Sequence, residues 1–98
     1  MTASPSKPTV LVLDDEKNIR TSIEIALSEE GMQVIAAHDA AAAWRALRER
    51  IIDLLILDIK LEEIDGLTFF RKMQQEGFSI PTLFISGNAT LTEAAQAV

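Results

Sequence analysis

Four short apolar runs divide the chain into a repeating pattern. They cover residues 9–13, 33–37, 54–57 and 82–85, and three of them are almost continuously hydrophobic. Continuous apolar runs of about four to eight residues are typical of strands that are buried on both faces of a parallel sheet. We therefore expect four strands at these positions.

Segments with apolar residues at helical spacing follow the first three runs, and they predict three helices. The helices are expected over residues 16–30, 39–51 and 65–76, and a capping box at Thr90–Glu93 predicts a fourth that continues to Val98. The expected N-caps are Asp14 or Asp15, then Asp39 and Asp65, and the expected stops are Gly31 and Gly77. The expected buried faces are Ile19, Ile23, Ala26 and Leu27 in the first helix, Ala40, Ala43, Trp44, Leu47 and Ile51 in the second, and Leu67, Phe70 and Met73 in the third.

This alternation of strands and helices indicates the fold class. It predicts an α/β domain with a doubly wound parallel sheet that is covered on both faces. A length of 98 residues allows one small domain, which we assign to residues 9–98. Residues 1–8 contain Pro5 and Pro8 and no apolar core, and we expect them to form a flexible N-terminal tail.

Composition and charge exclude several classes of protein. The net charge of −6 and the scattered basic residues argue against direct binding of nucleic acid. The absence of cysteine excludes disulfides and thiolate metal sites. The sequence has no apolar stretch of about 18 residues and no secretory signal. We therefore expect a cytoplasmic protein without a membrane segment.

Polar side chains stand at the ends of three of the predicted strands. Asp14 and Asp15 follow the first run, Asp58 ends the third, and Ser86 follows the fourth. Because the carboxyl ends of parallel strands face one crevice, these groups are expected at one rim of the sheet. Carboxylates that share a site repel one another unless a cation joins them, and hard oxygen ligands suit Mg²⁺.

These motifs together resemble the receiver domain of two-component response regulators, over residues 9–98. The residues that carry the resemblance are Val10-Leu11-Val12-Leu13-Asp14-Asp15-Glu16, Leu57-Asp58-Ile59, Asp65-Gly66 and Ile85-Ser86-Gly87. The resemblance implies a flavodoxin-like sheet with the strand order 2-1-3-4. It also implies a signalling module that a sensor histidine kinase phosphorylates.

The resemblance assigns a role to each residue at the rim. Asp58 is the implied phospho-acceptor, and a carboxylate needs no general base because it is already ionised at neutral pH. Asp14, Asp15, Asp58 and the backbone carbonyl of Lys60 are the implied Mg²⁺ ligands. Ser86 is expected to bind a phosphoryl oxygen and act as the switch once Asp58 is modified.

The sequence also departs from the family pattern. Glu62 stands where the family usually has a proline, four residues after the acceptor. The lysine and the aromatic residue of a fifth strand, and the last helix, are missing from the 98 residues. We therefore expect a fragment of a longer protein that self-associates through an exposed sheet edge or an exchanged segment. The last part of the sequence resembles regulators of the nitrogen-regulatory, sigma-54-activator type, through Ser86-Gly87-Asn88-Ala89-Thr90 and Thr92-Glu93-Ala94-Ala95. This resemblance implies an AAA+ and DNA-binding output region in the longer protein.

Other functions with similar chemistry remain as alternatives. A Mg²⁺-dependent phosphatase of the haloacid-dehalogenase type needs Asp-x-Asp at the nucleophile, whereas the chain has Asp58-Ile59-Lys60. A nucleotide-binding domain needs a Gly-rich phosphate loop after the first strand, where the chain is acidic. A receiver used only for protein contacts is expected to lose an acidic residue, and none is lost. We expect no enzyme beyond a module that catalyses its own phosphorylation and dephosphorylation.

Overall fold

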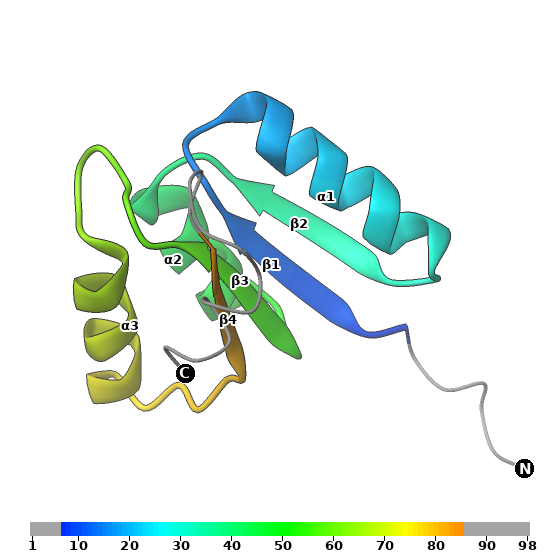
Figure 1. Ribbon diagram of the computed structural model, residues 1–98. Helices are drawn as coiled ribbons and strands as arrows, with labels where there is room; N and C mark the ends of the chain where they lie inside the picture. The colour runs from blue at the N-terminus through cyan, green and yellow to red at the C-terminus, as the bar shows by residue number, and fades with distance from the viewer. Residues whose placement is uncertain (1–6, 86–98) are drawn as a thin grey trace, which may run out of the picture.

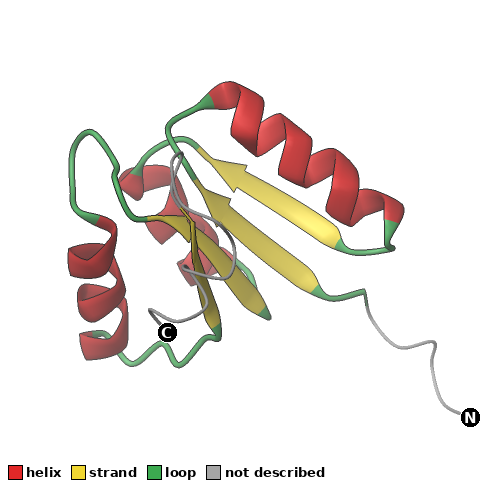
Figure 2. Ribbon diagram, in the orientation of Figure 1, coloured by secondary structure: helices red, strands yellow, loops and turns green. Residues whose placement is uncertain are grey.

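The computed structural model describes residues 7–85, and these form one sheet with three helices. The strands are β1 (Thr9–Leu13), β2 (Gln33–Ala37), β3 (Leu54–Asp58) and β4 (Thr82–Ile85). They pair in parallel in the order β2-β1-β3-β4, as Figure 2 shows, so the predicted order and fold class are confirmed. Ser86 and the helix expected over residues 90–98 lie outside the described residues.

The three helices lie on opposite sides of this sheet. Helix α1 (Lys17–Glu29) covers one side, and α2 (Ala40–Glu49) and α3 (Gly66–Gln75) cover the other (Figure 1). This arrangement follows from right-handed crossovers, because the chain moves from β1 to β2 in one direction and from β2 through β3 to β4 in the other. Within residues 7–85, no helix is long and apolar enough to span a membrane.

Alternating side chains of the strands build a core on each side. Leu11 and Leu13 of β1 face α2 and α3, together with Leu55 and Leu57 of β3. The residues between them, Val10, Val12 and Ile56, form the core cluster on the α1 side. Strands buried on both faces read as continuous apolar runs, which explains the sequence pattern.

The helix ends agree with the sequence except at the start of α1 and the end of α2. The carboxylates of Asp39 and Asp65 accept hydrogen bonds from the N–H groups of Ala42 and Leu67, as expected of N-caps. The prediction of Asp14 or Asp15 as the first N-cap was wrong, because Glu16 occupies that position without a side-chain cap. The predicted stops are confirmed: Gly31 and Gly77 have φ of 86° and 93°, in the left-handed region that glycine tolerates.

Several expectations about the buried faces were wrong, among them Leu67 of α3, which is 37% exposed. Phe69, not Phe70, is the fully buried aromatic residue of α3, and Phe70 is half-buried against Phe84. Ile51 is 87% exposed because α2 ends at Glu49 and the chain is extended from Arg50. Helix α1 has no fully buried residue, although Ile23 and Leu27 pack against the sheet.

Candidate functional site

The register of the two central strands brings two aspartates side by side. Leu13 of β1 pairs with Leu57 of β3, so Asp14 and Asp58, the residues that follow them, lie side by side at the ends of the two strands. Both carboxylates are buried, with 1% and 6% exposure respectively. Strand β4 flanks Asp58 on the other side, because Ile85 pairs with Asp58.

Asp15 joins these two residues to form an acidic cluster. One carboxylate oxygen from each of Asp14, Asp15 and Asp58 lies within 4.8 Å of the others. The structure therefore brings these three residues together at one rim, as predicted. Burial differs among them, since Asp15 is only half-buried.

Backbone N–H groups hold one oxygen of each carboxylate. Asp14 accepts from Glu16 at 2.8 Å, Asp58 accepts from Lys60 at 3.0 Å, and Asp15 accepts from Glu62 at 3.0 Å. Each carboxylate retains a second oxygen. The cluster is thus oriented by the backbone of the two loops that follow β1 and β3.

Burial and the neighbouring negative charges raise the pKa of two of these carboxyls. Burial raises the pKa of Asp14 to about 6, against the hydrogen bond from Glu16, and the charge of Asp58 adds to the increase. Burial likewise raises the pKa of Asp58, and the charge of Asp15 contributes to this. Three carboxylates held together at such a cost fit a divalent cation, which would remove both the repulsion and the desolvated charge. The donor set consists of hard oxygens, the kind that Mg²⁺ and Ca²⁺ accept.

The loop between β3 and α3 is closed tightly at its base. The N–H of Gly66 donates to the carbonyl oxygen of Ile59 at 2.8 Å, and Lys60 forms an antiparallel bridge with Asp65. A side chain at residue 66 would collide with the carbonyl oxygen of Asp58. The glycine therefore lets α3 begin directly against the end of β3, which fixes where Asp58 lies.

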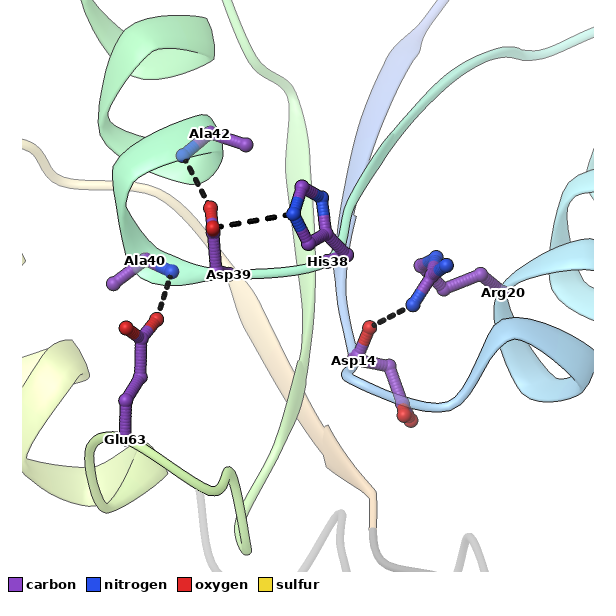
Figure 3. A network of polar contacts seen from close by, with 7 residues as sticks. All are labelled: Asp14, Arg20, His38, Asp39, Ala40, Ala42 and Glu63. Atoms are coloured by element: carbon purple, nitrogen blue, oxygen red, sulfur yellow. Dashed lines mark hydrogen bonds and ion pairs between the residues drawn. The ribbon is translucent and has the colours of Figure 1, made fainter.

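Two charged residues near the rim were not predicted from the sequence. Arg20 of α1 donates from Nη1 to the carbonyl oxygen of Asp14 at 2.8 Å, and Glu63 accepts from the N–H of Ala40 at 2.6 Å (Figure 3). Both side chains line a hollow of ≈ 340 Å³ beside Asp15. Neither contact has a signal in the sequence, because each joins residues whose proximity only the fold creates.

The remaining predicted site residues are placed in part. Lys60 lies next to the cluster, since its N–H holds Asp58. Ser86, the expected switch, lies outside the described residues. The described part of the site offers a buried carboxylate, Asp58, next to two carboxylates that can share a cation with it.

Comparison with known proteins gives a consistent result. The family model described as the response regulator receiver domain matches residues 10–98. A putative NtrX-like response regulator of Rickettsia typhi is 36% identical over 95 residues, which cover 95% of this chain and 20% of the relative. The transcriptional regulatory protein TrcR of Mycobacterium tuberculosis is 33% identical over 91 residues, covering 93% of this chain and 35% of that protein.

Solved structures show the same fold. A response regulator receiver protein from Pseudomonas putida aligns with a TM-score of 0.80 and 26% identity, over 96% of this chain and 79% of that one. The structure of NtrX from Brucella abortus in complex with ADP aligns with a TM-score of 0.80 and 33% identity, over 94% of this chain and 21% of that one. The chain spans about a fifth to a third of the length of the curated relatives that it matches.

Proposed function

Because this chain belongs to the receiver-domain family of two-component response regulators, we propose that it accepts a phosphoryl group on Asp58 from a sensor histidine kinase. The observation that carries the proposal is the cluster of Asp14, Asp15 and Asp58, which lies at the carboxyl ends of β1 and β3. As a receiver domain the chain is a signalling module, and its catalysis is limited to its own phosphorylation and dephosphorylation.

Asp58 is the nucleophile in this proposal. One of its carboxylate oxygens bonds to phosphorus while the bond from phosphorus to the donor breaks, leaving an aspartyl phosphate and the free donor. The N–H of Lys60 holds Oδ1 of Asp58 and keeps the carboxylate in place for this attack. The raised pKa of Asp58 makes its charged form costly, so a cation in the cluster would favour the reactive form.

The proposed cofactor is Mg²⁺, held by Asp14, Asp15, Asp58 and the backbone carbonyl of Lys60. When bound, it supplies charge neutralisation for an anion that attacks an anionic phosphoryl group. The support is the chemistry of the cluster, in which three carboxylate oxygens lie within 4.8 Å of one another. Asp14 and Asp58 are pre-positioned for this role by burial and by their backbone hydrogen bonds.

Ser86 completes the proposed site. It directly follows Ile85, which pairs with Asp58 across β3 and β4, and this order in the sequence supports the assignment. A hydroxyl that binds a phosphoryl oxygen moves its loop, and this movement is the proposed switch.

The output belongs to the longer protein in this proposal. Relatives are named as transcriptional regulatory proteins and as NtrX-like regulators, and one NtrX structure contains ADP. These names favour a cytoplasmic regulator whose output region includes AAA+ and DNA-binding parts. We also propose self-association through the edge of β4 or an exchanged segment, since β4 pairs only with β3 within residues 7–85.

The test is phosphorylation by a small-molecule donor. The intact mass of the chain is measured after incubation with acetyl phosphate, with and without Mg²⁺, beside an Asp58→Asn control. We expect an adduct of one phosphoryl group that requires Mg²⁺ and is lost in the control. An adduct of equal yield on the control protein would place the acceptor elsewhere. No adduct on a folded wild-type chain that binds Mg²⁺ would contradict the proposal for these 98 residues.

A further inference from the structure

The tip of the β3–α3 loop is attached to a helix that follows a different strand. Oε1 of Glu63 accepts a hydrogen bond from the N–H of Ala40 at 2.6 Å (Figure 3). Ala40 is the first residue of α2, where backbone N–H groups lack partners within the helix. The carboxylate satisfies one of these groups and lies at the positive end of the helix dipole. This contact therefore holds residue 63 of the loop against α2.

The neighbouring residue of the same loop tip contacts the acidic cluster. The N–H of Glu62 donates to Oδ2 of Asp15 at 3.0 Å. The base of the loop is closed by the bond from Gly66 to Ile59. The loop is thus fixed at its base and, through two adjacent residues, at its tip. A displacement of residue 63 would also move residue 62, to which it is directly bonded, and so would shift the N–H that Asp15 accepts from.

Asp15 depends on this contact more than the other two carboxylates do. Asp14 and Asp58 are buried, and each is held by the N–H two residues later in its own loop. Asp15 is half-buried, and its carboxylate is held by a donor 47 residues away. A half-exposed side chain has free rotamers unless a contact selects one. The position of Glu62 therefore decides how well Asp15 is oriented toward the cluster.

From these contacts we propose that Glu63 is a positioning residue for the cation site: by binding the N-terminus of α2, it holds the β3–α3 loop where Glu62 can orient Asp15. Glu63 acts through Ala40 and Glu62 and does not touch the cation. The inference rests on the proposed Mg²⁺ site. Groups that orient metal ligands typically change metal affinity by about 10- to 100-fold when they are removed.

The chain offers a matched control in the adjacent glutamate. Glu62 carries the same charge one residue earlier, and within residues 7–85 its side chain makes no hydrogen bond. Replacing either glutamate removes one negative charge near the site. Glu63→Gln keeps an oxygen that can accept from Ala40, whereas Glu63→Ala removes it. The difference between Gln and Ala at residue 63 thus isolates the hydrogen bond from the charge.

The experiment measures Mg²⁺ affinity by titration calorimetry for the wild-type chain and for E63Q, E63A, E62Q and E62A. Amide hydrogen exchange of Ala40 is measured in the same proteins without Mg²⁺. We expect E63A to bind Mg²⁺ about tenfold more weakly than E63Q, and E62A to match E62Q. We also expect the Ala40 amide to exchange faster in E63A than in the other four proteins.

Three outcomes would overturn the inference in different ways. Faster exchange at Ala40 in E63A with unchanged Mg²⁺ affinity would mean that the contact exists but does not position the site. Equal weakening in E63Q and E63A, beyond that in E62Q, would mean that the charge of Glu63 acts rather than its hydrogen bond. A wild-type chain that binds no Mg²⁺ would remove the proposed cation site itself, and Ala40 exchange would then report only on the structure.

Discussion

The two sides of the sheet differ in how completely their helices are buried. On the α2–α3 side, Phe69 and Met73 are fully buried against β1 and β3, and Trp44 packs on Phe69 with ring centroids 5.0 Å apart. On the α1 side, the helix has no fully buried residue. Within residues 7–85, a pocket of ≈ 210 Å³ opens there between α1 and strands β3 and β4, and it is lined by apolar residues such as Ile56 and Leu83.

Helices from both sides support the acidic cluster, but at different points. Asp58 shares the face of Ile56, on the α1 side, but α3 on the other side fixes its backbone through Gly66. Asp14 and Asp15 lie at the turn between β1 and α1, where Arg20 of α1 holds the Asp14 carbonyl. The backbone of the proposed nucleophile is thus supported by a helix of the densely packed side, and two of the proposed cation ligands lie next to the helix that has no fully buried residue. Rigid support is most useful for the group that reacts.

The largest expected effect contrasts the cores of the two sides. Phe69→Ala should lower the free energy of unfolding by about 3–5 kcal/mol, because it leaves a large cavity in a fully buried position. Leu27→Ala on α1 should cost only about 1–2 kcal/mol, since Leu27 is half-buried. Urea unfolding of both variants measures the difference. Equal losses would show that the α1 side is as well packed as the other.

A second contrast concerns two glycines. Gly66→Ala should destabilise the chain by up to about 3 kcal/mol and weaken Mg²⁺ binding, because the new Cβ would lie 2.8 Å from the Cα of Ile59 and collide with the Asp58 carbonyl. Gly31→Ala at the end of α1 meets no atom within 4 Å and should cost about 1 kcal/mol, for its positive φ alone. Thermal unfolding and Mg²⁺ titration compare the two, and an unchanged Mg²⁺ affinity in Gly66→Ala would contradict the role given to this glycine.

Replacing Asp14 should raise the stability of the chain in the absence of a cation, whereas the substitutions above lower it. Its pKa is about 6 in the folded chain against 3.8 ordinarily, so the folded state binds more protons than the unfolded state between roughly pH 4 and 6. The stability of the Mg²⁺-free chain should therefore fall as pH rises through this window. Asp14→Asn should remove this dependence and stabilise the Mg²⁺-free chain at pH 7 by an amount on the order of 2 kcal/mol.

The check is urea unfolding from pH 4 to 8 in the presence of a chelator and then of Mg²⁺. Wild type should gain more stability from Mg²⁺ above pH 6 than below it, and Asp14→Asn should gain little at any pH. A wild-type chain whose Mg²⁺-free stability rises between pH 4 and 6 would contradict the assignment of the raised pKa.

The smallest expected effect tests the contact between α1 and the cluster. Arg20→Ala removes the hydrogen bond to the Asp14 carbonyl and should cost about 1 kcal/mol of stability. Lys17→Ala, on the exposed surface of the same helix, is the matched control for loss of one positive charge. Urea unfolding measures both variants, because guanidinium chloride is itself a salt and would screen the charges. A loss in Lys17→Ala as large as in Arg20→Ala would assign the effect to net charge.

The parts of the fold that follow from local patterns could be predicted from the sequence. Continuous apolar runs gave the four strands, and the aspartates before α2 and α3 gave their starts, because N-capping depends on residues two or three positions apart. The meeting of Asp14 and Asp58 also followed, since parallel strands end at one edge. Ser86 stays a prediction, because it lies outside the described residues.

The errors arose where spacing alone could not choose between neighbouring positions. Phe69 and Phe70 are both aromatic and adjacent, and only the orientation in which α3 packs on the sheet decides which one is buried. Asp14 looked like an N-cap, but its carboxylate turns to the N–H of Glu16 within the cluster, so α1 begins later. The contact of Glu63 with Ala40 joins residues 23 positions apart and depends on the loop closing over α2.

The pairing of Leu13 with Leu57 has a consequence for how this chain can evolve. Because side chains alternate between the faces of a strand, inserting or deleting one residue within β1 or β3 would turn a buried carboxylate toward a helix and an apolar side chain toward the rim. Length changes near the proposed acceptor can therefore be accommodated in the loops, such as residues 59–65, but not in the strands themselves. Related sequences should vary in loop length on this edge while the distance from the start of each central strand to its aspartate stays constant.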